Sequence, residues 1–235
     1  MKYCILSLLF LVIFAVGTMS QTPQADADPV LQGSATYKLP QSAIDAEIDG
    51  KVTLSVHVDK TGKPTKAVLV TGLIWPCGKM PTKAMDEISK TLSETVMKLQ
   101  FSPAIKNNKP ISKDFGLSIT LKNPKVNSEP VEKDPTTGKP KAKQITAGVL
   151  NGKATSLPKP DYPGEAKVIR AGGAVPVQVL FDEAGKVIRA GAVGGHPMLQ
   201  LPARESACGA KFEPVSLEGK PIKVTGVITY NFVPH

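Results

Sequence analysis

Two stretches of the chain, Gly50–Lys63 and Gly173–Lys186, repeat one pattern. The first reads GKVTLSVHVDKTGK, the second reads GAVPVQVLFDEAGK, and they align without a gap. Apolar residues alternate along each stretch, as on a half-buried strand, and each stretch ends in an Asp-x-x-Gly-Lys turn. Alternation resumes around residues 67–71 and 190–194. Both stretches therefore predict a β-hairpin.

The correspondence continues towards the C-terminus of each copy. Phe-x-Pro at 101–103 matches Phe-x-Pro at 212–214, and Lys-Pro-Ile at 109–111 matches the same tripeptide at 220–222. The first copy holds additional residues around 73–84, which we interpret as a surface loop. The shared order, spacing and chemistry indicate an internal duplication.

A helix is expected between the hairpin and Phe-x-Pro in each copy. In the second copy, Pro202 fits only a first helical turn, and Gly209 would weaken a helix interior by about 1 kcal/mol. In the first copy, apolar residues recur at steps of three and four and form one stripe. The stripe consists of Met85, Ile88, Leu92, Val96 and Leu99.

A terminal strand closes each copy, at Phe115–Leu121 and at Val224–Val233. In the second copy, Val224, Ile228, Tyr230 and Phe232 share the face expected to be buried. The fold class predicted is α+β: two tandem small domains, each a three-stranded antiparallel sheet with two helices packed on one face. Pro176 lacks an N–H, so the strand that contains it should be an edge strand or carry a bulge.

The N-terminus predicts export. Residues 1–20 combine a short positive start, an apolar run and small residues before Gln21, which is typical of a cleaved signal peptide. An uncleaved signal that anchors the chain in the inner membrane is the alternative, and membrane contact is expected only there. The remaining divisions are a polar linker (21–33), the first copy (34–123), a Pro/Lys-rich linker (124–144) and the second copy (145–235).

Export would place Cys77 and Cys208 in an oxidising compartment. They form either one disulfide that joins the two copies or two independent thiols. No cysteine or histidine pair has the spacing of a metal site, so no metal is expected.

Catalysis and nucleic-acid binding are not expected. The three histidines, His57, His196 and His235, have no partner at a recognisable motif spacing, and no nucleophile or phosphate-binding motif is present, so we expect neither an enzyme nor a cofactor. The net charge of +9 is interleaved with acidic residues and is not gathered on an arginine-rich helix.

The second copy resembles the C-terminal domain family of TonB. The landmarks are Tyr162-Pro163, the turn at 182–185, Phe-x-Pro at 212–214 and Gly-x-Pro at 219–221. The first copy keeps the hairpin and Phe-x-Pro, but Asn108 stands where the family has glycine. The apolar N-terminal segment lacks the histidine of an energy transducer, and no long Pro-rich spacer follows it. The resemblance therefore extends to the binding domain, and active force transduction is not expected unless the N-terminal segment stays in the membrane.

The resemblance implies a non-catalytic periplasmic module that adds a segment of an outer-membrane receptor to a sheet edge during TonB-dependent transmembrane transport. The terminal strands are the expected edges, unless the linker or a neighbouring element covers them. The alternative function is an envelope structural or assembly protein whose repeats bind each other, another envelope protein or peptidoglycan. The partner-binding residues expected are Thr225, Val227, Thr229, Asn231, Tyr162 and Pro163.

Overall fold

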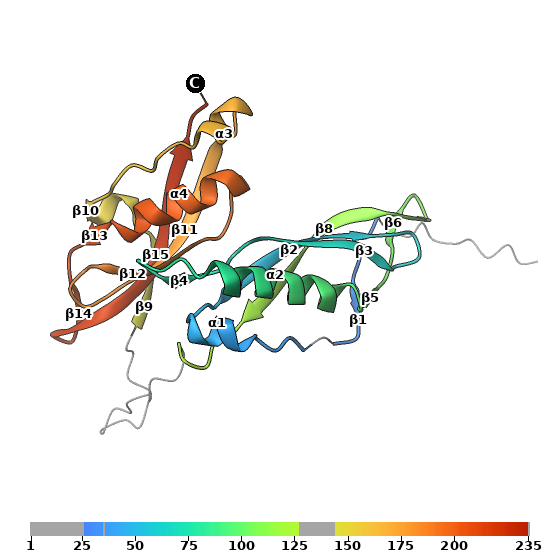
Figure 1. Ribbon diagram of the computed structural model, residues 1–235, viewed down its shortest axis with the longest axis horizontal. Helices are drawn as coiled ribbons and strands as arrows, with labels where there is room; N and C mark the ends of the chain where they lie inside the picture. The colour runs from blue at the N-terminus through green and yellow to red at the C-terminus, as the bar shows by residue number, and fades with distance from the viewer. Residues whose placement is uncertain (1–25, 35, 127–143, 235) are drawn as a thin grey trace, which may run out of the picture.

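The computed structural model describes residues 26–34, 36–126 and 144–234 (Figure 1). The predicted signal peptide and most of the second linker lie outside these residues. The described chain is a mixed α+β structure with four α-helices and several antiparallel sheets. We call residues 26–126 the N-terminal half and residues 144–234 the C-terminal half.

The two halves follow the same order of main elements. The N-terminal half contains β1 (Leu31–Gln32), α1 (Gln41–Asp45), β2 (Gly50–Val58), β3 (Pro64–Thr71), β4 (Trp75–Pro76), α2 (Thr82–Val96), β5 (Gln100–Phe101), β6 (Ala104–Lys106), β7 (Lys109–Ile111) and β8 (Lys113–Leu121). The C-terminal half contains β9 (Gln144–Val149), a 3-10 turn (Asn151–Lys153), β10 (Ala154–Ser156), α3 (Gly164–Val168), β11 (Gly173–Phe181), β12 (Val187–Ala192), α4 (Pro197–Cys208), β13 (Lys211–Phe212), β14 (Val215–Leu217) and β15 (Lys220–Phe232). Part of the predicted first linker (21–33) belongs to the N-terminal half, because β1 pairs with β5 and Leu31 packs against the core.

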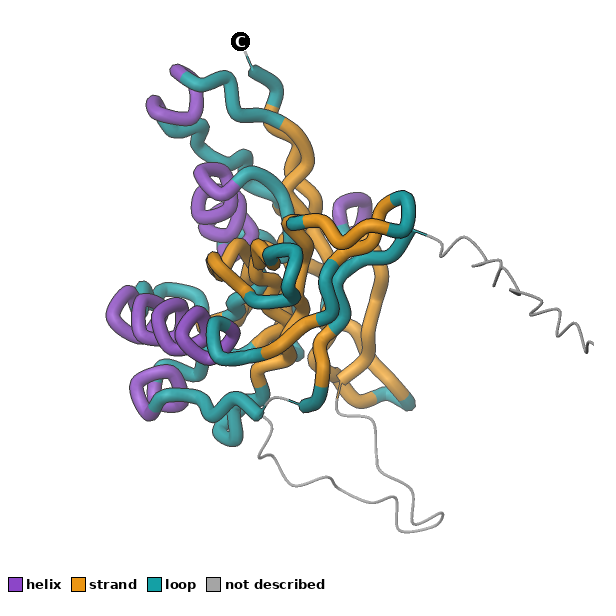
Figure 2. The backbone as a smooth tube through the Cα atoms, turned by 90° about the vertical axis from the view of Figure 1, so that its right-hand side faces the viewer, coloured by secondary structure: helices purple, strands orange, loops and turns teal. Residues whose placement is uncertain are grey.

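The sheets of the two halves differ in size. The N-terminal half has the antiparallel sheet β3-β2-β8. In the C-terminal half the matching strands β12-β11-β15 form the centre of a six-stranded sheet, to which β14, β4 and β9 are added. The expectation of three strands is wrong for this half, because β4 from the predicted loop, β9 from the start of the second copy and β14 also pair into its sheet. The α-helices lie on one side of the strands (Figure 2).

Each half has its own apolar core under its longer helix. In α2, Ala84, Ile88, Leu92 and Val96 are buried, and they face the inward side chains of β2. In α4, His196 caps the N-terminus by accepting a hydrogen bond at Nδ1 from the backbone N–H of Met198 (3.3 Å).

Two sequence expectations about proline are corrected. Helix α4 continues through Pro202. An N–H at this position would have bonded the carbonyl oxygen of Met198, an exposed residue in the first turn of the helix. Pro176 lies in the central strand β11, without a bulge at that position. Pairing of β11 with β12 begins only at Val177, so the missing N–H of Pro176 falls beyond the paired region.

The two hairpin turns connect directly to the two Phe-x-Pro segments. Gly62 and Gly185 have positive φ values of 87° and 79°. Each glycine carbonyl accepts a hydrogen bond from the N–H of the following phenylalanine, Phe101 (3.0 Å) and Phe212 (2.9 Å) respectively. The phenylalanine rings then enter the cores. A Cβ at Gly62 would lie 2.0 Å from the carbonyl oxygen of Phe101, and one at Gly185 would lie 1.9 Å from that of Phe212.

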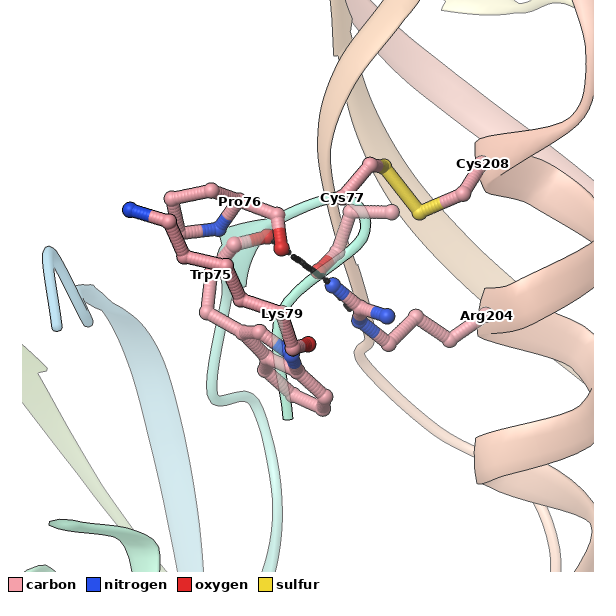
Figure 3. The surroundings of a disulfide bond; sticks show 7 residues. Trp75, Pro76, Cys77, Lys79, Arg204 and Cys208 are labelled. Carbon is pink, nitrogen blue, oxygen red and sulfur yellow. Dashed lines mark hydrogen bonds between the residues drawn. A yellow bond between two sulfur atoms is a disulfide. The ribbon is translucent and has the colours of Figure 1, made fainter. Parts of the chain in front are cut away.

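The two halves are joined through the segment that we interpreted as a surface loop. Trp75 of β4 is only 5% exposed, and β4 pairs with β12 of the other half. Cys77 forms a disulfide with Cys208 at the end of α4 (Figure 3). The loop interpretation is therefore wrong, because this segment supplies an edge strand and a covalent bond to the C-terminal half.

Two arginines reinforce this junction. Arg204 of α4 donates to the carbonyl oxygens of Trp75 (3.2 Å) and Pro76 (2.9 Å), and its guanidinium stacks 3.8 Å from the centre of the Trp75 ring (Figure 3). Burial lowers the pKa of Arg204 to about 10. Arg189 of β12 donates to the carboxylate of Asp49 and to the carbonyl oxygen of Glu47. Burial raises the pKa of Asp49, although Arg189 opposes this shift.

We predict that Gly185→Ala lowers the free energy of unfolding by more than about 2 kcal/mol, because the methyl group meets the backbone of Phe212. Gly219→Ala is the matched control: Gly219 also has a positive φ (75°), but nothing lies within 4 Å of an added Cβ. The control should cost only the backbone strain, about 1 kcal/mol. Urea unfolding measures both, and equal losses would contradict the role of the close contact.

We also predict that the double variant Cys77→Ser/Cys208→Ser loses about 2–4 kcal/mol of unfolding free energy, because the disulfide closes a loop between positions 131 residues apart. Urea unfolding followed by Trp75 fluorescence measures the loss. The unfolding curve of the native protein in reductant should match that of the double variant. Reductant should leave the unfolding curve of the double variant unchanged. Superimposable curves for all four samples would show that the disulfide does not stabilise the junction.

Candidate functional site

The outer edge of β8 is open within the described part of the chain. β8 pairs along its whole length with β2 and with no other described strand. Its inward side chains Phe115, Leu117 and Ile119 are only half-buried, although they contact the core of the N-terminal half. β8 therefore offers both unpaired backbone groups and incompletely covered apolar surface.

The corresponding edge of β15 is covered by the chain itself. β9 runs parallel to β15 and pairs with it from Lys223 to Val227, and Figure 1 shows β9 beside the lower part of β15. Ile145 and Ala147 of β9 pack against the core of the C-terminal half. This strand was not predicted from the sequence, because the predicted second copy begins at residue 145 with no strand at its start.

Beyond β9, Leu150 and Asn151 continue the cover. The N–H of Leu150 donates to the carbonyl oxygen of Val227 (2.9 Å), and the Leu150 side chain is buried. A Cβ at Gly226 would lie 2.6 Å from both the Ala147 carbonyl oxygen and the Leu150 side chain. A glycine at this position is what allows the covering segment to approach β15 so closely.

Asn151 takes the place of a strand residue opposite Thr229. Its side-chain amide donates to the Thr229 carbonyl oxygen (2.8 Å), and its side-chain oxygen accepts from the Thr229 N–H (2.9 Å). The amide thus satisfies both backbone groups of Thr229, as a peptide group of a neighbouring strand would do.

The predicted partner-binding residues of β15 are placed as follows. The side chains of Thr225, Val227 and Thr229 are half-buried on the outer face, and Asn231 is exposed. The expectation of an open edge is corrected for Thr225, Val227 and Thr229, because β9, Leu150 and Asn151 occupy their backbone groups. Partner binding by β15 stays a prediction, and it now requires β9 to detach.

Tyr162 and Pro163 lie near the other end of β15. The Tyr162 hydroxyl donates to the carbonyl oxygen of Ala171 (2.6 Å), and its ring packs edge-on against Phe232 (5.8 Å between centroids). Pro163 is the N-cap residue of α3. The structure therefore does not bring these two residues together with Thr225 and Val227, and partner binding by Tyr162 and Pro163 stays a prediction.

The equivalence of the halves identifies the open backbone groups of β8. Leu117 pairs with Leu54 as Ile228 pairs with Val177, so Ser118 corresponds to Thr229 and Gly116 to Val227. In β15 the backbone groups of Val227 and Thr229 point away from β11. The direction of the backbone N–H and C=O groups alternates along a strand. The groups of Gly116, Ser118 and Thr120 should therefore point away from β2, towards the open edge of β8.

The histidines do not form a catalytic arrangement in the described chain. His57 Nδ1 lies 3.0 Å from the exposed carboxylate of Asp114, and His196 caps α4. His235 lies outside the described residues. Groups of three or more metal-ligating side chains are absent from the part of the chain that the structure covers. Among the described helices, none has the length and apolarity needed to cross a membrane.

Comparison with known proteins gives a single family match. No curated protein and no solved structure matches the chain. Residues 158–234, which run from the segment before α3 to the end of β15, match the family model of the Gram-negative bacterial TonB protein C-terminal. This match lies within the C-terminal half and covers less than half of the chain, and it suggests a TonB-like role in envelope transport.

Proposed function

We propose that this protein is a non-catalytic, TonB-like binding protein of the bacterial periplasm, which captures an extended segment of an outer-membrane receptor by strand addition. The family match of residues 158–234 supports the receptor as partner, because domains of this family interact with outer-membrane receptors. Export through residues 1–20 would place the protein in the periplasm, either released or held by an uncleaved signal.

The two halves are, in this proposal, two copies of one domain. The same order of helix, hairpin, helix and terminal strand supports it, as does the identical pairing of the terminal strand with the first hairpin strand. The N-terminal copy has diverged further in sequence, since the family match does not include it.

The acceptor edge that we propose is β8. The observation that carries this assignment is the contrast between the two terminal strands: β15 already holds β9, whereas no described strand pairs with the outer side of β8. The β9 segment also illustrates the occupant, because it combines main-chain pairing with alternate apolar side chains, Ile145 and Ala147, that reach the core. A captured segment would cover Phe115, Leu117 and Ile119 in the same way.

We predict that Ser118→Pro weakens the binding of receptor segments at least about tenfold, because proline removes an outward N–H and obstructs the edge. Ser118→Ala keeps the N–H and should bind like the native protein. The measurement is calorimetric titration of the full chain with synthetic peptides that cover the periplasmic N-terminal segments of outer-membrane receptors. Circular dichroism would verify that the proline variant keeps its fold.

Asn151→Ala provides the discriminating control. This variant removes the side-chain amide that bonds the backbone groups of Thr229 in β15. Because β15 lies in the other half, binding at β8 should stay unchanged. Stronger binding by Asn151→Ala together with native binding by Ser118→Pro would assign capture to β15 and contradict the β8 assignment. Failure of every receptor peptide to bind would favour the envelope-assembly alternative.

A further inference from the structure

A cavity of about 410 Å³ lies where the two halves meet. Its lining comes from β3, β4 and α2 of the N-terminal half, and from α4 and the end of β12 of the C-terminal half. The volume falls within the range of about 300–1,000 Å³ that is usual for small-molecule sites. The proposed strand capture at β8 does not use this cavity.

The walls of the cavity are mainly aliphatic. Leu69, Leu73 and Met85 line it from the N-terminal half, and Leu201 lines it from α4. Leu201 is 42% exposed, so part of its side chain is open to a ligand in the cavity. The walls therefore favour an unbranched hydrocarbon chain, which can follow leucine and methionine side chains closely.

Arg204 adds a buried cation to this apolar lining. The residue is 3% exposed, and its Nε and Nη2 atoms donate to the carbonyl oxygens of Ala190, Trp75 and Pro76. No hydrogen bond engages Nη1 in the described structure, and no described carboxylate lies within 4 Å of the guanidinium. Burial of a guanidinium is costly, and the charge of the neighbouring Glu205 offsets only part of that cost. An anion at Nη1 would reduce the cost further.

Asp86 is the acidic residue of the lining. It lies on α2, whereas Arg204 lies on α4. A ligand with several negative charges would meet this carboxylate, whereas a single carboxylate can bind Arg204 and place its uncharged tail along the remaining wall.

We propose that the cavity binds a single-chain aliphatic carboxylate, whose head group pairs with Arg204 and whose hydrocarbon chain lies between α2 and α4. Guanidinium and carboxylate match each other in geometry and charge. The aliphatic lining and Leu201 would then lose their contact with water when the chain enters.

Trp75 makes the proposal directly measurable. It is the single tryptophan of the chain, it lines the cavity, and its ring stacks against Arg204. A ligand at Arg204 should therefore change the fluorescence emission of Trp75.

The experiment titrates the full, disulfide-bonded protein with decanoate, with decanol and with decyltrimethylammonium, which share the chain and differ in head-group charge. Trp75 emission and calorimetry are recorded for each. Decanoate should bind at least about tenfold more tightly than decanol, as expected for a charge-assisted hydrogen bond in a buried site. The cationic probe should bind more weakly than both. Equal binding of all three, or no binding of decanoate, would overturn the proposal.

Variants separate the cavity from general adsorption of amphiphiles. Leu201→Glu places a second acid on the wall and should weaken decanoate binding at least about tenfold. Met198→Glu is the matched control, because Met198 lies on the same helix, is 40% exposed and does not line the cavity. Equal loss in the two variants, or no loss in Leu201→Glu, would overturn the site.

Arg204→Gln tests the head group, because glutamine removes the charge and keeps an amide that can donate to the β4 carbonyl oxygens. Its decanoate affinity should fall to the level of decanol, with decanol affinity unchanged. An unchanged preference for decanoate would show that Arg204 does not recognise the carboxylate. Retention of the disulfide and of the far-ultraviolet circular dichroism spectrum would establish that this variant is folded.

Discussion

The outermost strand of a β-sheet leaves every second backbone N–H and C=O without a partner, and this constraint organises the whole molecule. In the C-terminal half both sides of the central strands β12-β11-β15 are closed by other segments of the chain, with β4 on β12 and β9 on β15. Asn151 extends this closure by one residue with a side-chain amide. In the N-terminal half, β8 has no described partner on its outer side. One sheet is thus completed within the chain, and the other has an outer edge that no described strand covers.

The junction between the halves fixes the direction of that edge. β4 follows the N-terminal hairpin in sequence, yet it belongs to the C-terminal sheet by pairing, and Cys77 bonds it to the end of α4. Arg189 and Arg204 add contacts from β12 and α4 to the N-terminal half. A strand edge that is held in one orientation loses less conformational freedom on binding than one on a freely rotating domain. For the proposed capture at β8, the junction would therefore lower the entropic cost of binding, even though it contributes no backbone group to that edge.

Much of the fold follows from local patterns, since hairpin periodicity, the helical stripe of α2 and the Phe-x-Pro segments all predict the elements found. Asn108 illustrates how local chemistry also explains a departure: it has a φ of 60°, and Gly219 at the matching turn has open space around it, so a left-handed asparagine can serve there. The parts that sequence did not predict depend on distant pairing. β4 has two residues and β9 follows a Pro/Lys-rich segment, so neither pattern identifies its partner strand. For the same reason, the sequence favoured Thr229 as an open edge residue, although the side chain of Asn151 already pairs with it.

The match to the TonB C-terminal family and the uncovered strand edge therefore lie in different halves of the protein. The half that matches the TonB C-terminal model has its terminal strand paired, and the half outside the match has its terminal strand unpaired in the described structure. Similarity alone would direct attention to β15, where a new strand would have to displace the pairing of β9, the burial of Leu150 and two hydrogen bonds from Asn151. At β8 a new strand would displace no described strand, and it would bury the exposed parts of Phe115, Leu117 and Ile119. Since the gain in backbone pairing is similar at both edges, the difference in what must be removed favours β8 as the acceptor.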